Sequence, residues 1–251
     1  MITIKNAAQI KQMSAACTIA AEALKLAGKN CKAGVDTAYI NEIVHRYIVE
    51  QGAKPSFLGY NGFSASTCIS VNDTVIHGIP SKKEILKDGD IVSVDVGAYF
   101  DGYHGDNAAT FAVGTISDNA RELIDVTKQC FYAGFAVAIK GNRVGDISAA
   151  VEAKAREHGF GVTKQYVGHG VGKALHESPE VPNFGVAGRG ARLVPGMTLA
   201  IEPMITESGD DCKTLKDGWT VKTIGGVLAS HYENTILITE AEPIILTQHN
   251  S

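Results

Sequence analysis

The segment Ile91-Val-Ser-Val-Asp-Val96 places an acidic residue inside a short run of β-branched residues. Such a run predicts a β-strand. In a strand, Ser93 and Asp95 would point to one face and the three valines to the other. A carboxylate in an apolar strand is costly to remove from water unless it has a partner. The segment therefore predicts both a buried sheet and a polar site on one of its faces.

A second apolar segment, Met197–Glu202, repeats this pattern further along the chain, and positions 95 and 202 differ by 107. The matched pairs are Gly52 with Gly159, Gly89 with Gly196, and Asp95 with Glu202. We interpret the match as an internal duplication, with halves of about residues 1–115 and 116–251. Two such halves would bring Asp95 and Glu202 to face each other. The alternative is chance, because two helices followed by strands is a common order of elements.

Periodicity extends this picture along the chain. Apolar residues at alternating spacings of three and four predict helices over Asn6–Gly28, from Asp36 or Thr37 to Gly52, over Asp118–Lys140 and over Asp146–Gly159. Asn6 and Asp146 are expected to cap their helices, and Gly28 to end the first. Further strands are expected at Thr67–Val71 and Glu233–Thr239. The simplest organisation is one α+β domain over residues 1–251.

Composition excludes several classes of protein. With 27 acidic and 23 basic residues and a pI near 6.1, the chain lacks the basic surface that binding to the nucleic-acid backbone requires. The longest apolar stretch, Cys130–Ile139, is about half a membrane span, and no signal-peptide core follows Met1, so we expect a cytoplasmic protein without a membrane partner. The glycine-rich loop Gly185–Gly190 lacks the lysine of a phosphate-binding loop.

The cysteines indicate neither a disulfide framework nor a zinc ribbon, because their number is odd and no two form a C-x-x-C pair. We expect most of them to be small core residues. They are Cys17, Cys31, Cys68, Cys130 and Cys212.

Four carboxylates stand in apolar, strand-like settings: Asp95, Asp106, Glu202 and Glu233. For each one alone, a salt-bridged or hydrogen-bonded strand residue is the alternative. If the four converge, protons or cations must relieve their repulsion, and divalent metal is the usual solution. The sequence thus favours a metal site.

Three histidines in glycine or proline turns are candidate site residues. His169 is flanked by two glycines, His176 follows seven residues later, and His77 precedes Gly78 and Pro80. An ordinary structural role is the alternative for each. The other histidines receive no role: His45, His104, His158, His231 and His249.

Together these motifs resemble those of the type I, bacterial methionine aminopeptidases over nearly the whole chain. The matching motifs are Cys68-Ile-Ser-Val-Asn72 with His77-Gly-Ile-Pro80, Asp95 with Asp106, Gly168-His169-Gly170 with His176, Ala200-Ile-Glu202-Pro203, and Asp217-Gly-Trp219 with Glu233-Asn-Thr235. The resemblance implies the pita-bread (creatinase/aminopeptidase-like) fold, in which two pseudo-symmetric halves enclose a dinuclear metal site. It assigns the metal ligands as Asp95, Asp106, His169, Glu202 and Glu233.

The resemblance also implies a mechanism. Asp106 and Glu233 would bridge two divalent ions, with Asp95 on one ion and His169 and Glu202 on the other. One imidazole and four carboxylates suit Mn²⁺, Fe²⁺, Co²⁺ or Zn²⁺. A hydroxide bridging the ions would attack the first peptide bond, with Glu202 as general base.

Substrate contacts are implied in the same way. His176 would donate a hydrogen bond to the carbonyl oxygen under attack, and His77 would hydrogen-bond the scissile amide or adjacent backbone. The methionine pocket would consist of Tyr60, Phe63, Cys68, Leu175 and Trp219.

The expected function is removal of the initiator methionine from nascent proteins, with a preference for a small second residue. The expected partners are nascent polypeptide N-termini, with association with the ribosome and a monomeric state as further expectations. A proline-directed aminopeptidase of the same fold, a catalytically inactive peptide-binding module and a metal-free hydrolase are the alternatives. A complete ligand set argues against an inactive module, and proline-directed relatives generally carry an extra N-terminal domain.

Two positions depart from the family pattern. Asn234 follows Glu233, where the family usually has histidine, and Gly225 stands where an acidic residue is common. The residue after Glu233 would point to the opposite strand face, so we expect a packing change with ligation intact.

Overall fold

Four helices and fifteen strands are found in residues 2–248, the part of the chain that this computed structural model describes. The helices are α1 (Ala7–Asn30), α2 (Thr37–Glu50), α3 (Asp118–Ala136) and α4 (Val144–Glu157), and the short 3₁₀ turns are η1 (Tyr60–Gly62) and η2 (Ile224–Gly226). His249, which received no role, lies outside the described residues.

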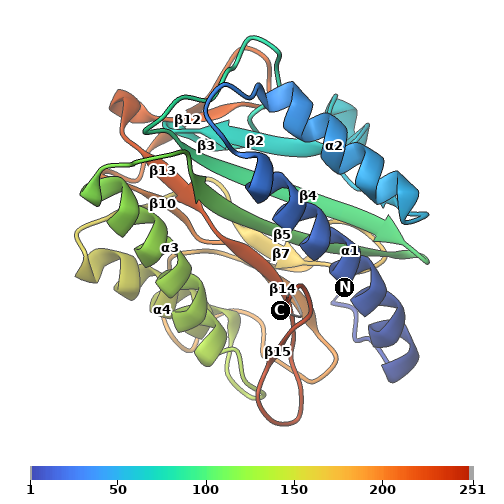
Figure 1. Cartoon of the computed structure of the whole chain (residues 1–251). Coiled ribbons are helices and arrows are strands. Elements are labelled where there is room, and N and C mark those ends of the chain that lie inside the picture. The colour runs from blue at the N-terminus through green and yellow to red at the C-terminus, as the bar shows by residue number, and fades with distance from the viewer. Residues whose placement is uncertain (1, 249–251) are drawn as a thin grey trace.

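The largest sheet has nine strands in the order β1-β4-β5-β14-β9-β7-β8, with β2 on β4 and β15 on β14. Its strands are β1 (Lys54–Pro55), β2 (Thr67–Val71), β4 (Ile91–Phe100), β5 (Tyr103–Ala112), β7 (Gly168–Gly170), β8 (Glu177–Val181), β9 (Thr198–Ile201), β14 (Glu233–Leu237) and β15 (Ile244–Ile245). Strand β14 pairs antiparallel with both β5 and β9, and Asn234 is opposite Asn107 on one side and Ile201 on the other. A strand close to the C-terminus therefore occupies the centre of the sheet (Figure 1).

Two three-stranded sheets complete the fold. Their orders are β13-β10-β6 and β11-β12-β3. The strands are β3 (Thr74–Ile76), β6 (Gly161–Val162), β10 (Met204–Thr206), β11 (Cys212–Thr214), β12 (Val221–Thr223) and β13 (Ala229–His231).

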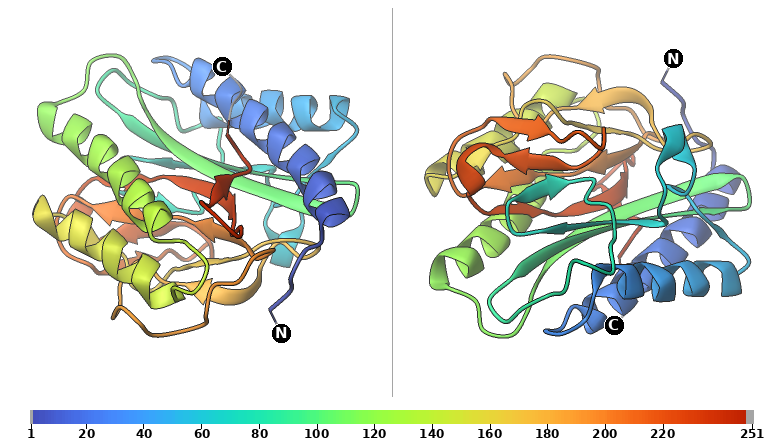
Figure 2. Two further views of the ribbon diagram at one scale, coloured as in Figure 1. Left: turned by 90° about the horizontal axis from the view of Figure 1, so that it is seen from below. Right: turned by 90° about the horizontal axis from the view of Figure 1, so that it is seen from above.

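The helices form two pairs that cover the same side of the strands (Figures 1 and 2). Helices α1 and α2 bury Leu24 and Ile40 in one core with Val92, Val94 and Val96 of β4. Helices α3 and α4 form a second core with β9 and β14. Because side chains alternate along a strand, Asp95 faces away from the helices.

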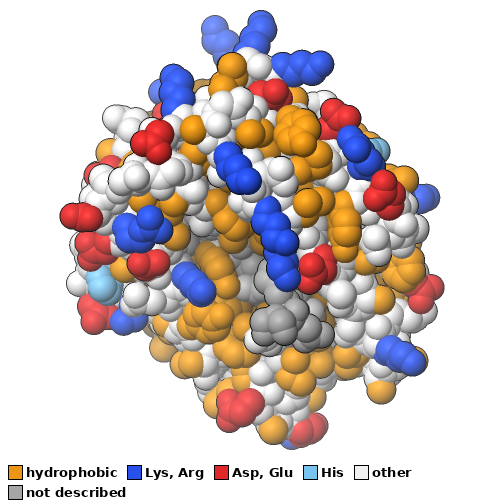
Figure 3. All heavy atoms as spheres, in the orientation of Figure 1, with side chains coloured by type: hydrophobic (Ala, Val, Ile, Leu, Met, Phe, Trp, Pro, Cys, Tyr) orange, Lys and Arg blue, Asp and Glu red, His pale blue; other side chains and the backbone are white. Residues whose placement is uncertain are grey.

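The surface over helices α1 and α3 carries basic and acidic side chains side by side (Figure 3). This mixture agrees with the near balance of charges in the sequence. Among the described residues, none of the helices has both the length and the apolar character needed to span a membrane. All five cysteines have free thiols, and four of them are buried, as expected.

Helix α1 begins as predicted but ends later. Asn6 caps it through a reciprocal capping box with Gln9. The prediction that Gly28 ends the helix is wrong, because α1 continues to Asn30. Gly28 instead allows close packing, since a Cβ at this position would lie 2.3 Å from Cε1 of Phe111 on β5. This glycine sets the distance between α1 and the sheet.

The helices of the second pair, α3 and α4, also begin or end at residues other than those predicted. Helix α3 stops at Ala136, four residues before the expected Lys140. Helix α4 begins at Val144, so the prediction that Asp146 is its N-cap is wrong. The Asp146 carboxylate accepts the backbone N–H of Arg143 and that of Gly188, each at 2.7 Å. It thereby joins the glycine-rich loop to the first turn of the helix.

The expected strands are present with shifted ends. Strand β2 matches its prediction, whereas β4 continues to Phe100 and places Asp95 at its middle. The paired glycines have nearly equal backbone angles. Their φ values are +73° and +76° for Gly52 and Gly159, and +95° and +88° for Gly89 and Gly196. The internal duplication, which would produce such pairs, stays a prediction.

Candidate metal centre

Neighbouring strands bring the five expected ligands together on the sheet face away from the helices. Asp95 lies on β4, Asp106 on β5, His169 on β7 and Glu233 at the start of β14, and Glu202 directly follows β9. Asp95 and Glu233 are both opposite Ala108 of β5 in the strand register. The sheet thus forms the site from residues far apart in sequence.

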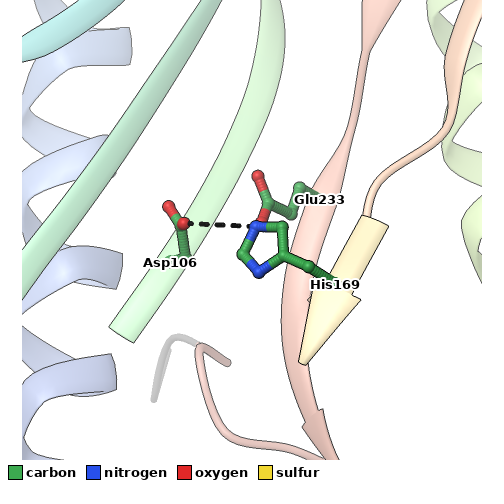
Figure 4. Close-up of side chains that lie close together, drawn as sticks. All are labelled: Asp106, His169 and Glu233. Carbon is green, nitrogen blue, oxygen red and sulfur yellow. Dashed lines mark ion pairs between the residues drawn. The ribbon is translucent and has the colours of Figure 1, made fainter. Parts of the chain in front are cut away.

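The side chains converge closely. His169 Nε2 lies 3.4 Å from Glu202 Oε1 and 4.0 Å from Asp106 Oδ2. Ligand atoms of Asp106, His169 and Glu233 all lie within 4.8 Å of one another (Figure 4). A second group satisfies the same distance limit, and its members are Glu202, Glu233 and His231.

The carboxylates are poorly solvated. Burial raises the pKa of Asp95, Glu202 and Glu233 well above their usual values, and the negative charge of neighbouring carboxylates raises them further. Burial also raises the pKa of Asp106 to about 7. No lysine or arginine is among the described residues that line the cavity around them. The cluster therefore lacks a resident positive charge.

Several of these oxygens have no hydrogen-bond partner within residues 2–248. They are Asp95 Oδ1, Asp106 Oδ1 and Glu233 Oε1. Buried carboxylate oxygens without donors are expensive unless a cation binds them. Four carboxylates and one imidazole are a suitable donor set for divalent ions of the Mn²⁺ to Zn²⁺ series. The residues present therefore fit a divalent metal centre.

His169 is oriented by its backbone. Its Nδ1 lies 2.8 Å from the carbonyl oxygen of Gly170, so Nδ1 donates and the lone pair of Nε2 faces the carboxylates. Cβ atoms at Gly168 and Gly170 would lie 2.4 Å from Ala200 O and 2.5 Å from Ser178 O, respectively. The glycines therefore let β9 and β8 pack closely on both sides of the ligand. Burial lowers the pKa of His169 to about 3, which keeps the imidazole neutral.

The two accessory histidines lie in the same cavity. The ring of His176 is 4.1 Å from that of His169, and its Nδ1 is 2.7 Å from the Tyr60 hydroxyl. His77 has φ +57° and contacts Trp219 edge to face. Burial, together with the smaller effect of the nearby His176, lowers the pKa of His77 to about 4.

A cavity of about 300 Å³ contains the whole arrangement. It is lined by the five expected ligands, both accessory histidines and all the expected pocket residues. Tyr60, Phe63, Cys68, Leu175 and Trp219 belong to one apolar cluster, in which Phe63 and Trp219 are in edge-to-face contact at 5.0 Å. Phe57 and Tyr166 also line the cavity and were not predicted, because no motif surrounds them.

His231, to which the sequence analysis assigned no role, is buried beside the carboxylates. Its Nε2 is 3.8 Å from Glu202 Oε2 and 3.8 Å from Glu233 Oε2. A spacing of two residues from Glu233 could have indicated it, because residues i and i+2 of an extended segment share a face.

The loop that carries His176 is held by an ion pair absent from the sequence analysis. Lys5 Nζ lies 2.8 Å from Glu177 Oε2, and both side chains are largely buried. Glu177 Oε1 accepts the backbone N–H groups of Lys173 and Ala174. The N-terminal segment thus supports the loop 172–177.

The two departures from the family pattern lie outside the ligand cluster. Asn234 is buried on the other strand face, where its Oδ1 accepts a hydrogen bond from Thr247 Oγ1 at 2.8 Å. Gly225 adopts φ +85° within η2.

Comparisons with known proteins give a matching family model and similar sequences. The model of metallopeptidase family M24 matches residues 11–240. A methionine aminopeptidase of Clostridium acetobutylicum is 50% identical over 98% of this chain and 99% of the relative. Methionine aminopeptidase 1 of Bacillus subtilis is 46% identical over 99% of this chain and 100% of the relative.

Solved structures show the same similarity. The crystal structure of a methionine aminopeptidase from Thermotoga maritima superposes with a TM-score of 0.98 at 41% identity, covering 99% of this chain and 100% of that one. A prolidase from Pyrococcus furiosus shares the fold, with a TM-score of 0.79 at 24% identity. The superposition with the prolidase covers 99% of this chain but only 66% of the prolidase.

Proposed function

This chain belongs to metallopeptidase family M24, and we propose that it is a methionine aminopeptidase that removes the initiator methionine of new polypeptides. Its pita-bread fold, expected from the sequence, is that of the methionine aminopeptidase and prolidase structures. The observation that carries the proposal is a single cavity that joins a buried carboxylate cluster to an apolar, aromatic pocket.

We assign the metal ligands as Asp95, Asp106, His169, Glu202 and Glu233. Together these five residues would hold two divalent ions, as the resemblance implies. Bound divalent ions neutralise the carboxylates and make water acidic enough to supply hydroxide near neutral pH. The unpartnered oxygens of Asp95, Asp106 and Glu233 support this assignment.

His176 is assigned as the donor to the carbonyl oxygen of the scissile bond. The Tyr60 hydroxyl can donate to His176 Nδ1, which leaves the proton of the neutral imidazole on Nε2. That N–H can stabilise the negative charge that develops on the oxygen. Glu202 accepts the proton of the attacking water. His77 hydrogen-bonds the scissile amide or the adjacent backbone.

Selectivity for methionine has a physical source in the pocket. Tyr60, Phe63, Cys68, Leu175 and Trp219 supply apolar and aromatic contacts that suit a flexible, polarizable thioether. The carboxylate cluster in the same cavity, with the divalent ions that it would hold, would favour a free α-amine, which only a chain end offers. We also propose a preference for a small second residue, which the family resemblance implies.

We extend the proposal to location, partners, oligomeric state and domain organisation. The enzyme acts in the cytoplasm as a monomer, on chains still attached to or newly released from the ribosome, because initiator methionine is exposed there first. It is a single catalytic domain over residues 1–251, built from duplicated halves of about 1–115 and 116–251. The matching φ values of Gly52 with Gly159 and of Gly89 with Gly196 support the duplication.

The decisive test compares Met-Ala-Ser with Leu-Ala-Ser as substrates. Protein stripped with a chelator should be inactive, and added Mn²⁺ or Co²⁺ should restore cleavage of the methionine peptide. Equal cleavage of both peptides would refute the assignment of methionine specificity. A third substrate, Ala-Pro-Ser, tests proline-directed activity. Its preferential cleavage would favour a proline-directed aminopeptidase.

A further inference from the structure

His231 lies beside the carboxylates of the metal centre but does not line the cavity. Its side chain is 2% exposed, and it is absent from the residues that line the cavity. Its Nε2 has no hydrogen-bond partner in the described part of the chain. A buried polar atom without a partner is costly, so this imidazole calls for a functional explanation.

The backbone of His231 is fixed to the same sheet that carries the ligands. Its N–H donates to Thr110 Oγ1 at 3.0 Å, and its carbonyl oxygen accepts from Thr110 Oγ1 at 2.9 Å. Thr110 in turn shares a hydrogen bond of 2.7 Å with Ser93, which lies two residues before Asp95 on β4. The position of the imidazole is therefore set by strands β4 and β5.

The carboxylate of Glu202 lies between two histidines. Its Oε1 is 3.4 Å from His169 Nε2, and its Oε2 is 3.8 Å from His231 Nε2. His231 is equally distant from Oε2 of Glu233, whose Oε1 has no partner within residues 2–248. One oxygen of each glutamate thus faces His231, and the other is left for a cation.

The two histidines present the same atom, Nε2, to the carboxylates, but in different protonation states. His169 donates through Nδ1 to Gly170 O and presents a lone pair from Nε2. Both nearest oxygens of His231 Nε2 are acceptors, so a lone pair on this atom would be repelled and an N–H is favoured. The separations of 3.8 Å exceed a hydrogen bond, but a rotation that shortens one by less than about 1 Å forms it.

We propose that His231 is a positioning residue of the metal centre, whose Nε2–H orients the carboxylates of Glu202 and Glu233 toward the ions. The proposal rests on the proposed metal-dependent function, since it assumes that these glutamates bind metal. Donors behind metal-binding carboxylates commonly change metal affinity by about 10- to 100-fold. His231 therefore contributes to metal retention without contacting metal or substrate.

The test compares three variants by calorimetric titration of chelator-stripped protein with Mn²⁺. His231→Leu removes the donor, His231→Gln retains an N–H group, and His158→Gln is the control at the half-buried C-terminal end of α4, away from the site. We expect His231→Leu to weaken Mn²⁺ binding by about 10-fold or more, and His231→Gln to recover to within about threefold of the unmodified protein. His158→Gln should bind as the unmodified protein does.

The visible absorption spectrum of the Co²⁺ form separates a positioning residue from a ligand. His231→Gln should leave the band positions unchanged, because the ligand atoms stay the same. A shifted spectrum would make His231 a ligand and overturn the proposal, and so would unchanged Mn²⁺ affinity in His231→Leu. If His231→Leu does not fold, His231→Asn, whose shorter amide cannot reach the glutamates, replaces it under the same criteria. Failure of the unmodified protein to bind Mn²⁺ would instead refute the proposed function.

Discussion

At the scale of single residues, the site depends on which atom of each polar side chain is already engaged. His169 uses Nδ1 for a backbone carbonyl, and His176 uses Nδ1 for the Tyr60 hydroxyl. In both, Nε2 is left to face the cavity, once as a lone pair and once as an N–H donor. The same type of residue thus performs opposite tasks because its second nitrogen has a different partner.

The donor role of His176 predicts a selective loss of turnover. His176→Ala should lower kcat for Met-Ala-Ser by about 100-fold or more, because a donor to the developing oxyanion is lost. Metal content, measured by elemental analysis, should stay unchanged. Tyr60→Phe, which removes only the partner of Nδ1, should give a smaller loss. Full turnover in His176→Ala would disprove its role.

Asp106 should instead be required for metal. Asp106→Ala removes a carboxylate assigned to both ions, so we expect loss of bound metal along with loss of activity. Elemental analysis after dialysis against Mn²⁺ checks this. A variant that retained two ions per chain would contradict the assignment.

The ion pair between Lys5 and Glu177 predicts that the N-terminal segment stabilises the loop that carries His176. Lys5→Met leaves Glu177 as a largely buried carboxylate without its cation, and breaking such pairs costs roughly 3–5 kcal/mol. We expect the lower end of this range, because backbone N–H groups still bind Glu177. Urea unfolding measures the change, with the exposed Lys11→Met as control. Equal stability of the two variants would show that the ion pair contributes nothing.

Single residues also show what the sequence could and could not predict. The ligands and accessory histidines were predicted because carboxylates in apolar strands and glycine-flanked histidines are unusual, and family motifs include them. Lys5 could not be recognised in this way, because its partner Glu177 is distant in sequence. His231 lies only two residues from Glu233, but no family motif includes it, and its other neighbour, Glu202, is distant in sequence.

At the scale of elements, the existence and type of helices and strands were predicted better than their ends. Gly28 resembles a helix terminator in sequence, yet Phe111 of a distant strand explains its presence. Asp146 resembles an N-cap, yet it binds backbone groups as the third residue of α4. Local sequence cannot distinguish these alternatives, since each depends on a segment brought near by folding.

The packing of α1 on β5 gives a prediction with an unusual sign. Alanine normally stabilises a helix interior by about 1 kcal/mol relative to glycine. Gly28→Ala should instead destabilise the protein by roughly 1–2 kcal/mol, because overpacking against the Phe111 ring outweighs this gain. The free energies of unfolding of Gly28→Ala, Phe111→Leu and the double variant, measured by thermal unfolding, form a double-mutant cycle. The double variant should be more stable than the two single changes predict together, and strict additivity would exclude this contact as the cause.

At the scale of the whole molecule, the buried carboxylates link stability to pH and to metal. Their pKa values are raised in the folded protein, so the folded state without metal binds more protons than the unfolded chain. The stability they contribute is therefore lost as pH rises through the folded pKa values, which for Asp106 is about 7. Buried histidines have lowered pKa values and reduce stability only below about pH 6.5.

Chelator-stripped protein should consequently lose stability as the pH rises from 6.5 through the folded pKa of Asp106 near 7, by about 1.4 kcal/mol per pH unit for each extra proton that the folded state binds. Added Mn²⁺ should reduce or reverse this slope, because ions replace the protons and bind better to ionised carboxylates. Urea unfolding at several pH values checks both effects. Asp106→Asn, which has one fewer carboxylate, should show a flatter slope. A stripped protein whose stability rises over this interval would contradict the direction of these shifts.

The central place of β14 has a consequence for how the chain is made. Strand β5 is synthesised more than a hundred residues before its partner β14, and β9 is also synthesised before β14. Until β14 has been translated, both strands expose unpaired edges, which invite association with other chains. Synthesis paused before residue 233 would therefore yield a protein that chaperones must shield, and the arrival of β14 would complete the central sheet.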